Sequence, residues 1–269
     1  MDIPLSHDKY VEYKTWGEFF PDANVNLRSI KFHHSWFDMF EKLFNDKKFA
    51  NIIEKKLSDE LKEDLEVIIH PAPELIFNAF LLTRFDTLSV VIIGQDPYFL
   101  KETCGGITVQ QAMGLSFSVP HGLAVPSSLD SVYRNMLKNG HVTKRPTHGN
   151  LEFLALQGVL WLNSALTVKD GRDNVGCHLQ TWSWFTDAII RYISANKEHV
   201  VFVLWGKHAV DKMSLIDTDK HDVVVSTHPA GQSCATPQKW GLAFNDVDHF
   251  GKINGYLEKK NKEGIVWQV

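Results

Sequence analysis

Cysteine is scarce in this sequence, and its few cysteines stand far apart. The chain of 269 residues has only three, Cys104, Cys177 and Cys234, and it has no Cys-x-x-Cys pair. This pattern indicates neither a disulfide framework nor a zinc ribbon, and it favours a reducing compartment. The histidines include no His-Glu-x-x-His arrangement, so we expect no metal and no other cofactor.

An excess of positive charge and long apolar runs are also missing. The formal net charge is -4 and the pI is near 6.3, which argues against a broad basic surface that coats nucleic acid, so any contact with DNA must be local. No segment approaches the roughly 20 apolar residues that span a bilayer, and the opening residues Met1-Asp2-Ile3-Pro4 do not resemble a signal peptide. We therefore expect an intracellular protein without a membrane segment.

The chain contains no linker rich in Gly, Ser or Pro, and its length suits one large core. We predict a single domain over residues 1–269, with residues 1–34 as an N-terminal extension. Neither a Gly-x-x-x-x-Gly-Lys loop nor a Gly-x-Gly-x-x-Gly fingerprint is present. A nucleotide-phosphate enzyme is therefore the last of the functions considered.

What the sequence does contain is a set of four apolar runs, each ending at a glycine or a polar residue. Continuous β-branched runs of this kind are typical of parallel strands covered on both faces. Apolar residues at helical spacing surround them, which predicts a three-layer α/β/α sandwich around a central, mostly parallel four-stranded sheet. The runs are Val90–Gly94 before Gln95, Gly158–Leu162 before Asn163, Val200–Trp205 before Gly206, and Val223–Thr227 before His228.

Helices are predicted around residues 36–44, 49–57, 75–82, 182–193 and 249–259. A further helix should start at Pro126-Ser127-Ser128, with Ser127 or Ser128 as its N-cap. Its buried face is predicted to carry Val132, Tyr133, Met136 and Leu137.

In a parallel sheet the ligand crevice lies beyond the carboxyl ends of the strands. Gln95, Asp96, Asn163, Gly206 and His228 should therefore line one rim. Gly94 allows a sharp turn off the strand, and Pro97 restricts Asp96 to extended backbone, so the carboxylate is held in place. Taken alone, Asp96-Pro97 fits an ordinary turn equally well.

Five motifs, read in order, carry a family resemblance. They are Gly94-Gln95-Asp96-Pro97-Tyr98, Gly114–Val119, Gly158–Asn163, Leu204-Trp205-Gly206 and His228-Pro229. From about Trp36 to the carboxyl terminus the chain resembles the family-one uracil-DNA glycosylases. The resemblance implies hydrolysis of the N-glycosidic bond of deoxyuridine in DNA by base flipping, with release of uracil and an abasic site in base-excision repair.

By this resemblance, Asp96 orients the attacking water and stabilises the sugar cation, and His228 donates to uracil O2 as negative charge builds there. Both roles suit a reaction that separates an oxocarbenium-like sugar from a uracil anion. An isolated histidine before a proline is more often a capping or core residue. The place of His228 at a strand end, beside the other rim residues, favours the catalytic interpretation.

The base-binding residues implied by the resemblance are Gln95, Tyr98, Phe117 and Asn163. The Asn163 amide complements N3–H and O4 of uracil, although the same amide turned over would suit cytosine. Tyr98 packs against C5 and excludes thymine, and Phe117 stacks on the base. A lone aromatic residue is more often core packing, and only the motif context favours these roles.

The DNA-binding positions follow from the same comparison. Pro126, Ser127 and Ser128 match the family's Pro-rich loop, Gly206 and Lys207 its Gly-Ser loop, and Ser233 its final serine. Helix starts and exposed amides bind phosphate without a large basic patch. Lys207 adds a positive charge beside the phosphate path, which predicts a steeper salt dependence than serine would give.

Two departures from the family pattern affect catalysis and DNA opening. Phe99 stands where the family has histidine, and Gln232 stands at the place of its wedge leucine. The following segment contains Trp240, Leu242 and Phe244, and apolar side chains of this type insert between base steps in DNA-kinking proteins. We expect one of them, with Leu242 favoured, to replace the wedge; packing beneath a surface loop is an equally good interpretation.

The expected partner is DNA containing uracil, single- or double-stranded, and the expected state is a monomer in the nucleus or another compartment that holds DNA. Replication or repair proteins and a DNA-mimicking inhibitor protein are further candidate partners. The alternative function is a DNA-binding replication accessory with a weakly active or inactive pocket, suggested by Phe99 and the altered wedge loop. The presence of Asp96, Asn163 and His228 argues against it.

Overall fold

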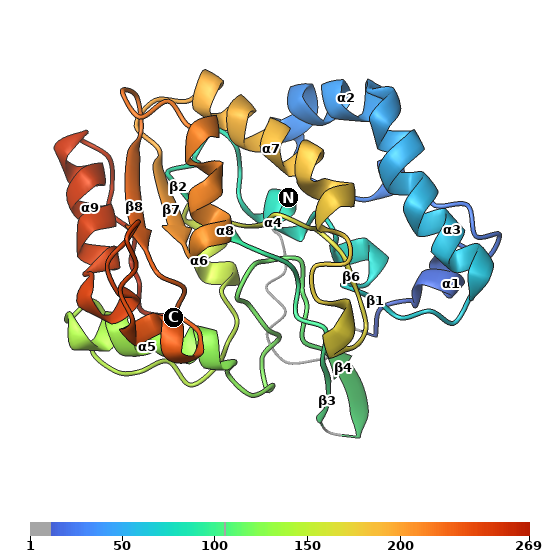
Figure 1. The fold of residues 1–269 in the computed structure, drawn as a ribbon, viewed down its shortest axis with the longest axis horizontal. Coiled ribbons are helices and arrows are strands. Elements are labelled where there is room, and N and C mark those ends of the chain that lie inside the picture. Colours follow the sequence, from blue (N-terminus) through green and yellow to red (C-terminus); the bar gives the residue numbers. More distant parts are fainter. Residues whose placement is uncertain (1–11, 105) are drawn as a thin grey trace.

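A parallel sheet of four strands lies at the centre of the molecule, in the order β5-β2-β7-β8. Figure 1 labels β2, β7 and β8 of this sheet. The computed structural model describes residues 12–104 and 106–269. All four predicted strands are confirmed, as β2 (Val90–Gly94), β5 (Val159–Asn163), β7 (Val201–Trp205) and β8 (Asp222–Ser226). Every residue of β2, β5 and β7 is buried, which explains why these runs show no polar alternation.

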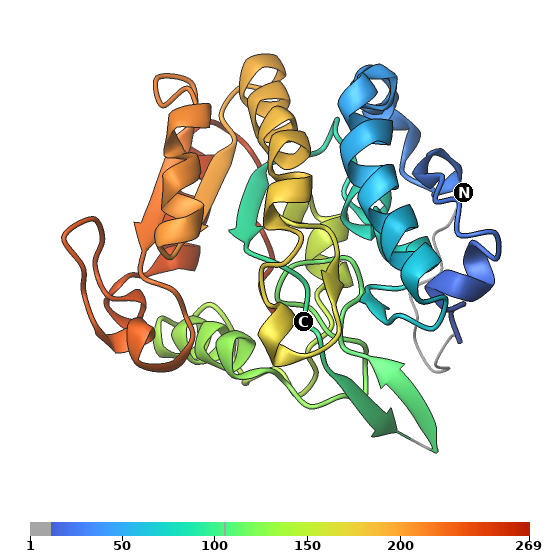
Figure 2. The same ribbon diagram turned by 45° about the vertical axis from the view of Figure 1, so that its right-hand side comes forward.

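Helices cover both faces of this sheet, as the predicted three-layer sandwich requires. The chain goes from β2 to β5 in one direction and from β5 to β7 and β8 in the other, so right-handed crossovers put the connecting helices on opposite faces. Figure 2 shows α7 and α8 in front of the sheet. The helices are α1 (Trp16–Phe19), α2 (Phe37–Asn45), α3 (Lys55–Glu63), α4 (Asn78–Leu82), α5 (Ser127–Lys138), α6 (Glu152–Leu156), α7 (Leu179–Asn196), α8 (Lys207–Val210) and α9 (His249–Lys259).

Two small antiparallel pairs lie outside the central sheet. Strand β1 (Ile69–His70) pairs with β6 (Val168–Lys169), and β3 (Lys101–Cys104) pairs with β4 (Ile107–Gln110). The β3–β4 hairpin projects from the body of the molecule (Figures 1 and 2). It was not predicted from the sequence, because its exposed residues carry no apolar run.

The helix at Pro126 differs from its prediction in two respects. Pro126 itself is the N-cap, with extended backbone, and no side chain caps the helix, so the prediction of Ser127 or Ser128 as cap is wrong. The two serines are instead the first helical residues. Leu137 is 42% exposed, contrary to prediction, because it lies in the last turn of the helix, which ends at Lys138.

The described part of the predicted N-terminal extension packs against the core. Trp16 is buried, and its indole Nε1 donates to the Pro71 carbonyl at 3.0 Å. Residues 1–11 of the extension, including the opening Met1-Asp2-Ile3-Pro4, lie outside the described residues. Within residues 12–104 and 106–269, no helix has both the length and the apolar character needed to cross a bilayer.

Candidate active site

The ends of β2 and β5 bring two predicted site segments together. Gly94 lies opposite Asn163 in the parallel register. The pairing continues beyond the strands, because Ser164 N–H donates to the Gly94 carbonyl at 3.0 Å and Ala165 N–H donates to the Gln95 carbonyl at 2.9 Å. Gln95 and Asn163 therefore lie together at the carboxyl ends of neighbouring strands, the side of the sheet at which ligands bind in α/β folds.

Gly94 makes room for the Asn163 amide. A Cβ atom at position 94 would collide with Asn163 Oδ1 and would come within 2.8 Å of Ser116 Cβ. Ser116 is fully buried, and its hydroxyl has no hydrogen-bond partner among the described residues. The glycine is thus required by close approach, in addition to the turn that the sequence suggested.

The Asp96 carboxylate is fixed from a loop distant in sequence. Its Oδ2 accepts the Gly176 backbone N–H at 2.6 Å. Burial raises the pKa of Asp96, and hydrogen bonds from Gly176 and Gln95 partly offset that rise. Sequence reasoning missed Gly176; a glycine just before a predicted helix was the available signal, but nothing connected it to Asp96.

Tyr98 and Phe117 lie side by side. The Tyr98 hydroxyl donates to the Phe117 carbonyl at 3.5 Å, and burial raises the pKa of the phenol, which keeps it neutral. Phe117 is buried and has a φ of 63°. Its ring packs edge-on against Trp205 with the centroids 5.6 Å apart.

His228 lies two residues after the end of β8 and completes this group. Its ring centroid lies 5.9 Å from that of Phe117. The Ala230 N–H donates to His228 Nδ1 at 3.1 Å, and burial lowers the pKa of the imidazole. Gly206, with a φ of 90°, lies so close that a Cβ there would come within 3.0 Å of His228 Cβ, so Gly206 has a packing role beside the histidine.

The predicted DNA-binding residues form the outer part of the same region. Helix α5, which begins after Pro126 with Ser127 and Ser128, packs against the short helix η7 (Gly231–Ala235). Gln232 and Ser233 are exposed on η7. The Ser233 carbonyl accepts the Thr227 hydroxyl at 2.6 Å, next to His228.

The three wedge candidates occupy different environments. Phe244 is fully buried and stacks on His249 with the centroids 4.3 Å apart, so it is a packing residue. Trp240 is half-buried. Leu242 is 59% exposed, while its carbonyl accepts the Thr227 N–H at 2.9 Å. Leu242 is therefore the candidate whose backbone is held at Thr227, next to His228, and whose side chain remains exposed.

Lys207, at the start of α8, is exposed and forms an ion pair with Asp211 one helical turn away. The carboxyl ends of β2 and β5, together with the loop after β8, carry most of the predicted site residues. Across the described part of the chain, no three His, Cys, Asp or Glu side chains are grouped as a metal site would require.

Comparisons with known proteins agree with the motifs. Residues 83–258 match the family model described as the uracil DNA glycosylase superfamily. The uracil-DNA glycosylase of Helicobacter hepaticus is 39% identical over 244 residues, which cover 91% of this chain and 98% of the relative. The chain belongs to the family-one uracil-DNA glycosylases. The family and the fold predicted from the sequence are thereby confirmed.

A viral relative is similar over nearly the whole chain of this glycosylase. A probable uracil-DNA glycosylase of Acanthamoeba polyphaga mimivirus is 39% identical over 268 residues, covering 96% of this chain and 70% of the relative. The crystal structure of mimivirus uracil-DNA glycosylase matches with a TM-score of 0.89 at 38% identity, covering 98% of this chain and 97% of that chain. A variant of the mimivirus protein has been crystallised in complex with UGI.

Proposed function

We propose that this chain hydrolyses the N-glycosidic bond of deoxyuridine in DNA, releasing uracil and leaving an abasic site. Membership of the family assigns it uracil-DNA glycosylase activity in base-excision repair. The observation that carries the proposal is a carboxylate after β2, an amide at the last residue of β5 and an imidazole after β8, all at the carboxyl ends of the parallel strands. These groups match the charge that develops when a base anion leaves a sugar cation.

Asp96 acts on the sugar side of the bond. Its ionised carboxylate orients the attacking water and offers negative charge to the oxocarbenium-like sugar. The Gly176 N–H occupies Oδ2, which fixes the plane of the carboxylate before substrate binds. A carboxylate held in this way loses little energy to reorganisation in the transition state.

His228 acts on the base side as a neutral donor. Because the Ala230 N–H donates to Nδ1, that nitrogen carries no proton and the ring proton is assigned to Nε2. Burial lowers the pKa of the ring and so favours the neutral form. The Nε2–H then donates to uracil O2 as negative charge accumulates, without prior protonation of the histidine.

Base selection rests on four side chains. Asn163 pairs with N3–H and O4, and the close fit at Gly94 restricts where its amide lies. Tyr98 excludes the C5 methyl of thymine, and Phe117 provides the stacking surface. Gln95 lies next to the Gly176 loop and forms a further wall of the base site.

The DNA is held outside this pocket. Extruding a nucleotide from a duplex costs a few kcal/mol, which contacts to the base and the phosphates offset. The start of α5 with Ser127 and Ser128, the Gly206-Lys207 turn, and Ser233 provide phosphate contacts. Leu242 enters the base stack as the wedge, beside Gln232.

The expected partners follow from this activity. The substrate is uracil-containing DNA, single- or double-stranded, and the chain works as a monomer in the nucleus or another compartment that holds DNA. A variant of the mimivirus relative binds UGI, which supports recognition of this chain by a DNA-mimicking inhibitor protein. Replication or repair proteins are further candidate partners.

An oligonucleotide assay tests the proposal. The wild-type chain should release free uracil from a uracil-containing strand and leave matched thymine and cytosine strands intact, and Asp96→Asn should lose the activity. Tyr98→Ala should gain measurable release of thymine. An accessory protein with an inactive pocket would bind the same strand without releasing uracil, and that result would overturn the proposal.

A further inference from the structure

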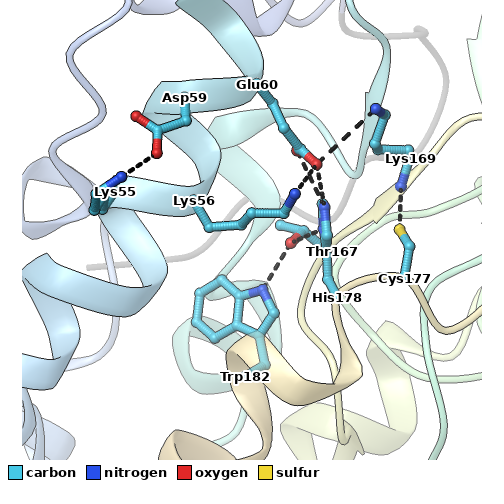
Figure 3. Close-up of polar contacts among 9 residues, drawn as sticks. All are labelled: Lys55, Lys56, Asp59, Glu60, Thr167, Lys169, Cys177, His178 and Trp182. Carbon is cyan, nitrogen blue, oxygen red and sulfur yellow. Dashed lines mark hydrogen bonds and ion pairs between the residues drawn. The ribbon is translucent and has the colours of Figure 1, made fainter.

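Glu60, on the N-terminal helix α3, is a buried carboxylate that the mechanism above does not use. It is 4% exposed. Its two carboxylate oxygens lie 3.2 and 3.1 Å from Nε2 of His178, which is fully buried (Figure 3). A buried carboxylate stays in place only when charged or hydrogen-bonded partners offset its loss of hydration.

The partners of this pair come from three parts of the chain. Lys56 Nζ lies 3.0 Å from Glu60 Oε1, and Lys169 Nζ of β6 lies 4.0 Å from the same atom. His178 Nδ1 and the Thr167 hydroxyl are 2.9 Å apart. Trp182 Nε1 of α7 donates to that hydroxyl at 2.7 Å. Both ring nitrogens of His178 therefore have partners.

The pair is charged at neutral pH. Burial alone would lower the pKa of His178, but its contacts with Cys177 and Glu60 raise it to about 9. Burial opposes ionisation of Glu60 as well, yet His178 and Lys56 bring its pKa below the usual range. The groups that face the pair are thus Lys56 on its own helix, Lys169 from β6, and Cys177 from the loop before α7.

This pair is attached directly to the proposed active site. His178 ends the loop before α7, and Gly176, two residues earlier, donates its N–H to Asp96 Oδ2 at 2.6 Å. The loop is closed on itself, because Leu179 N–H donates to the Gly176 carbonyl at 3.0 Å. Because the His178 imidazole is fixed by its partners, it also fixes the nearby Gly176 peptide, whose N–H holds the Asp96 carboxylate.

We propose that Glu60 is a positioning residue for uracil release, which holds the Gly176 N–H on the Asp96 carboxylate through His178. The inference rests on the function proposed above. Helix α3 lies outside the matched residues 83–258, so the N-terminal layer of this chain contributes to the geometry of its catalytic carboxylate. Glu60 itself does not touch the substrate.

The proposal predicts a specific kinetic signature. The Gly176 bond lowers the pKa of Asp96, so weakening that bond moves the acid limb of the pH–rate profile to higher pH. It also lowers kcat more than it changes KM, because Asp96 acts on the sugar and not on base binding. If Glu60 had only a structural role, its substitution would reduce the folded fraction of the protein and leave the acid limb of the pH–rate profile unchanged.

Glu60→Gln is the test, and Asp59→Asn is its matched control. The two positions are adjacent on α3 and undergo the same change from acid to amide, but Asp59 is exposed and pairs with Lys55 away from His178 (Figure 3). On a single-stranded uracil oligonucleotide, Glu60→Gln should lower kcat by roughly 10- to 100-fold, as expected for the removal of a charged hydrogen bond. Its acid limb should move to higher pH, and Asp59→Asn should behave as wild type.

A second measurement does not depend on activity. Hydrogen exchange at the Gly176 amide should be faster in Glu60→Gln than in Asp59→Asn, even if the wild-type chain releases no uracil and the proposed function fails. If Glu60→Gln does not fold, Thr167→Val removes the contact at His178 Nδ1 and should show the same two changes. A folded variant with an unmoved acid limb and unchanged exchange at Gly176 would overturn the proposal.

Discussion

Gly94 and Asn163 face each other across β2 and β5, and the space that a side chain at position 94 would fill is occupied by the Asn163 amide. Gly94→Ala should therefore displace the amide. We expect kcat/KM on a uracil oligonucleotide to fall by about 10- to 100-fold, from the ~1–3 kcal/mol that a good bidentate base contact contributes. Gly255→Ala is the control, since a Cβ there meets no atom within 4 Å. Equal kinetics for the two variants would refute this role of Gly94.

The pH dependence of uracil release should have an acid limb set by Asp96. Burial raises the pKa of this carboxyl, so protonation, and with it loss of activity, begins above its ordinary value of about 3.9. Burial lowers the pKa of His228, which favours the neutral ring, so the rate should stay level around neutral pH. The profile of kcat on single-stranded DNA measures both. A rate that rises as the pH falls would contradict the two assignments.

Leu242→Ala should impair duplex DNA selectively. The exposed side chain lies beside the loop after His228, and removing a wedge affects only substrates whose base must leave a stack. We expect a loss on the order of 10-fold on duplex and little change on single strands. Val266→Ala, at a residue that is 60% exposed, controls for loss of surface apolar area. Equal losses on both substrates would count against the wedge.

The salt dependence of the reaction rate should depend on Lys207, through its contact with the DNA phosphates. Lys207→Ser is expected to reduce the slope of log rate against log salt by about one, because the variant neutralises one phosphate fewer and so releases fewer counterions. Lys55→Ser is matched to it, because both lysines are exposed and each pairs with an aspartate four residues later. If the slope is the same in Lys207→Ser and wild type, Lys207 does not touch DNA.

Stability should depend on pH through the Glu60–His178 pair. The pKa of His178 is raised from 6.5 to about 9 in the folded chain, and that of Glu60 is lowered from 4.5. The pair's contribution is therefore complete between pH 4.5 and pH 6.5 and is lost as the pH rises through 9. The difference in Tm between wild type and Glu60→Gln should therefore be largest near pH 6 and should shrink toward pH 10. A difference that stays constant over this range would show that His178 is not charged in the folded chain.

The sequence predicted the strands correctly because of their burial. The runs at β2, β5 and β7 are apolar throughout, since helices cover both faces of the sheet, and such runs are recognisable without any partner information. The rim followed from the same logic, because parallel strands end at a common edge. Asp96, Asn163 and His228 could thus be placed together before their contacts were known.

Contacts between distant segments could not be predicted in this way. The bond from Gly176 to Asp96 joins residues 80 positions apart, and that from His178 to Glu60 joins residues 118 apart. No periodicity connects such positions. The N-cap at Pro126 was missed for a local reason, since Ser127 and Ser128 are the residue types that usually cap helices.

Phe117 has a left-handed backbone, with a φ of 63°, which for a bulky residue costs on the order of 1–3 kcal/mol. The surrounding rings and the Tyr98 hydroxyl hold it there before any nucleotide arrives. The flat surface that we propose for stacking on the incoming pyrimidine is therefore made during folding of the chain. None of the affinity gained from the flipped base is then consumed in shaping that wall, and more of it remains to offset the opening of the double helix.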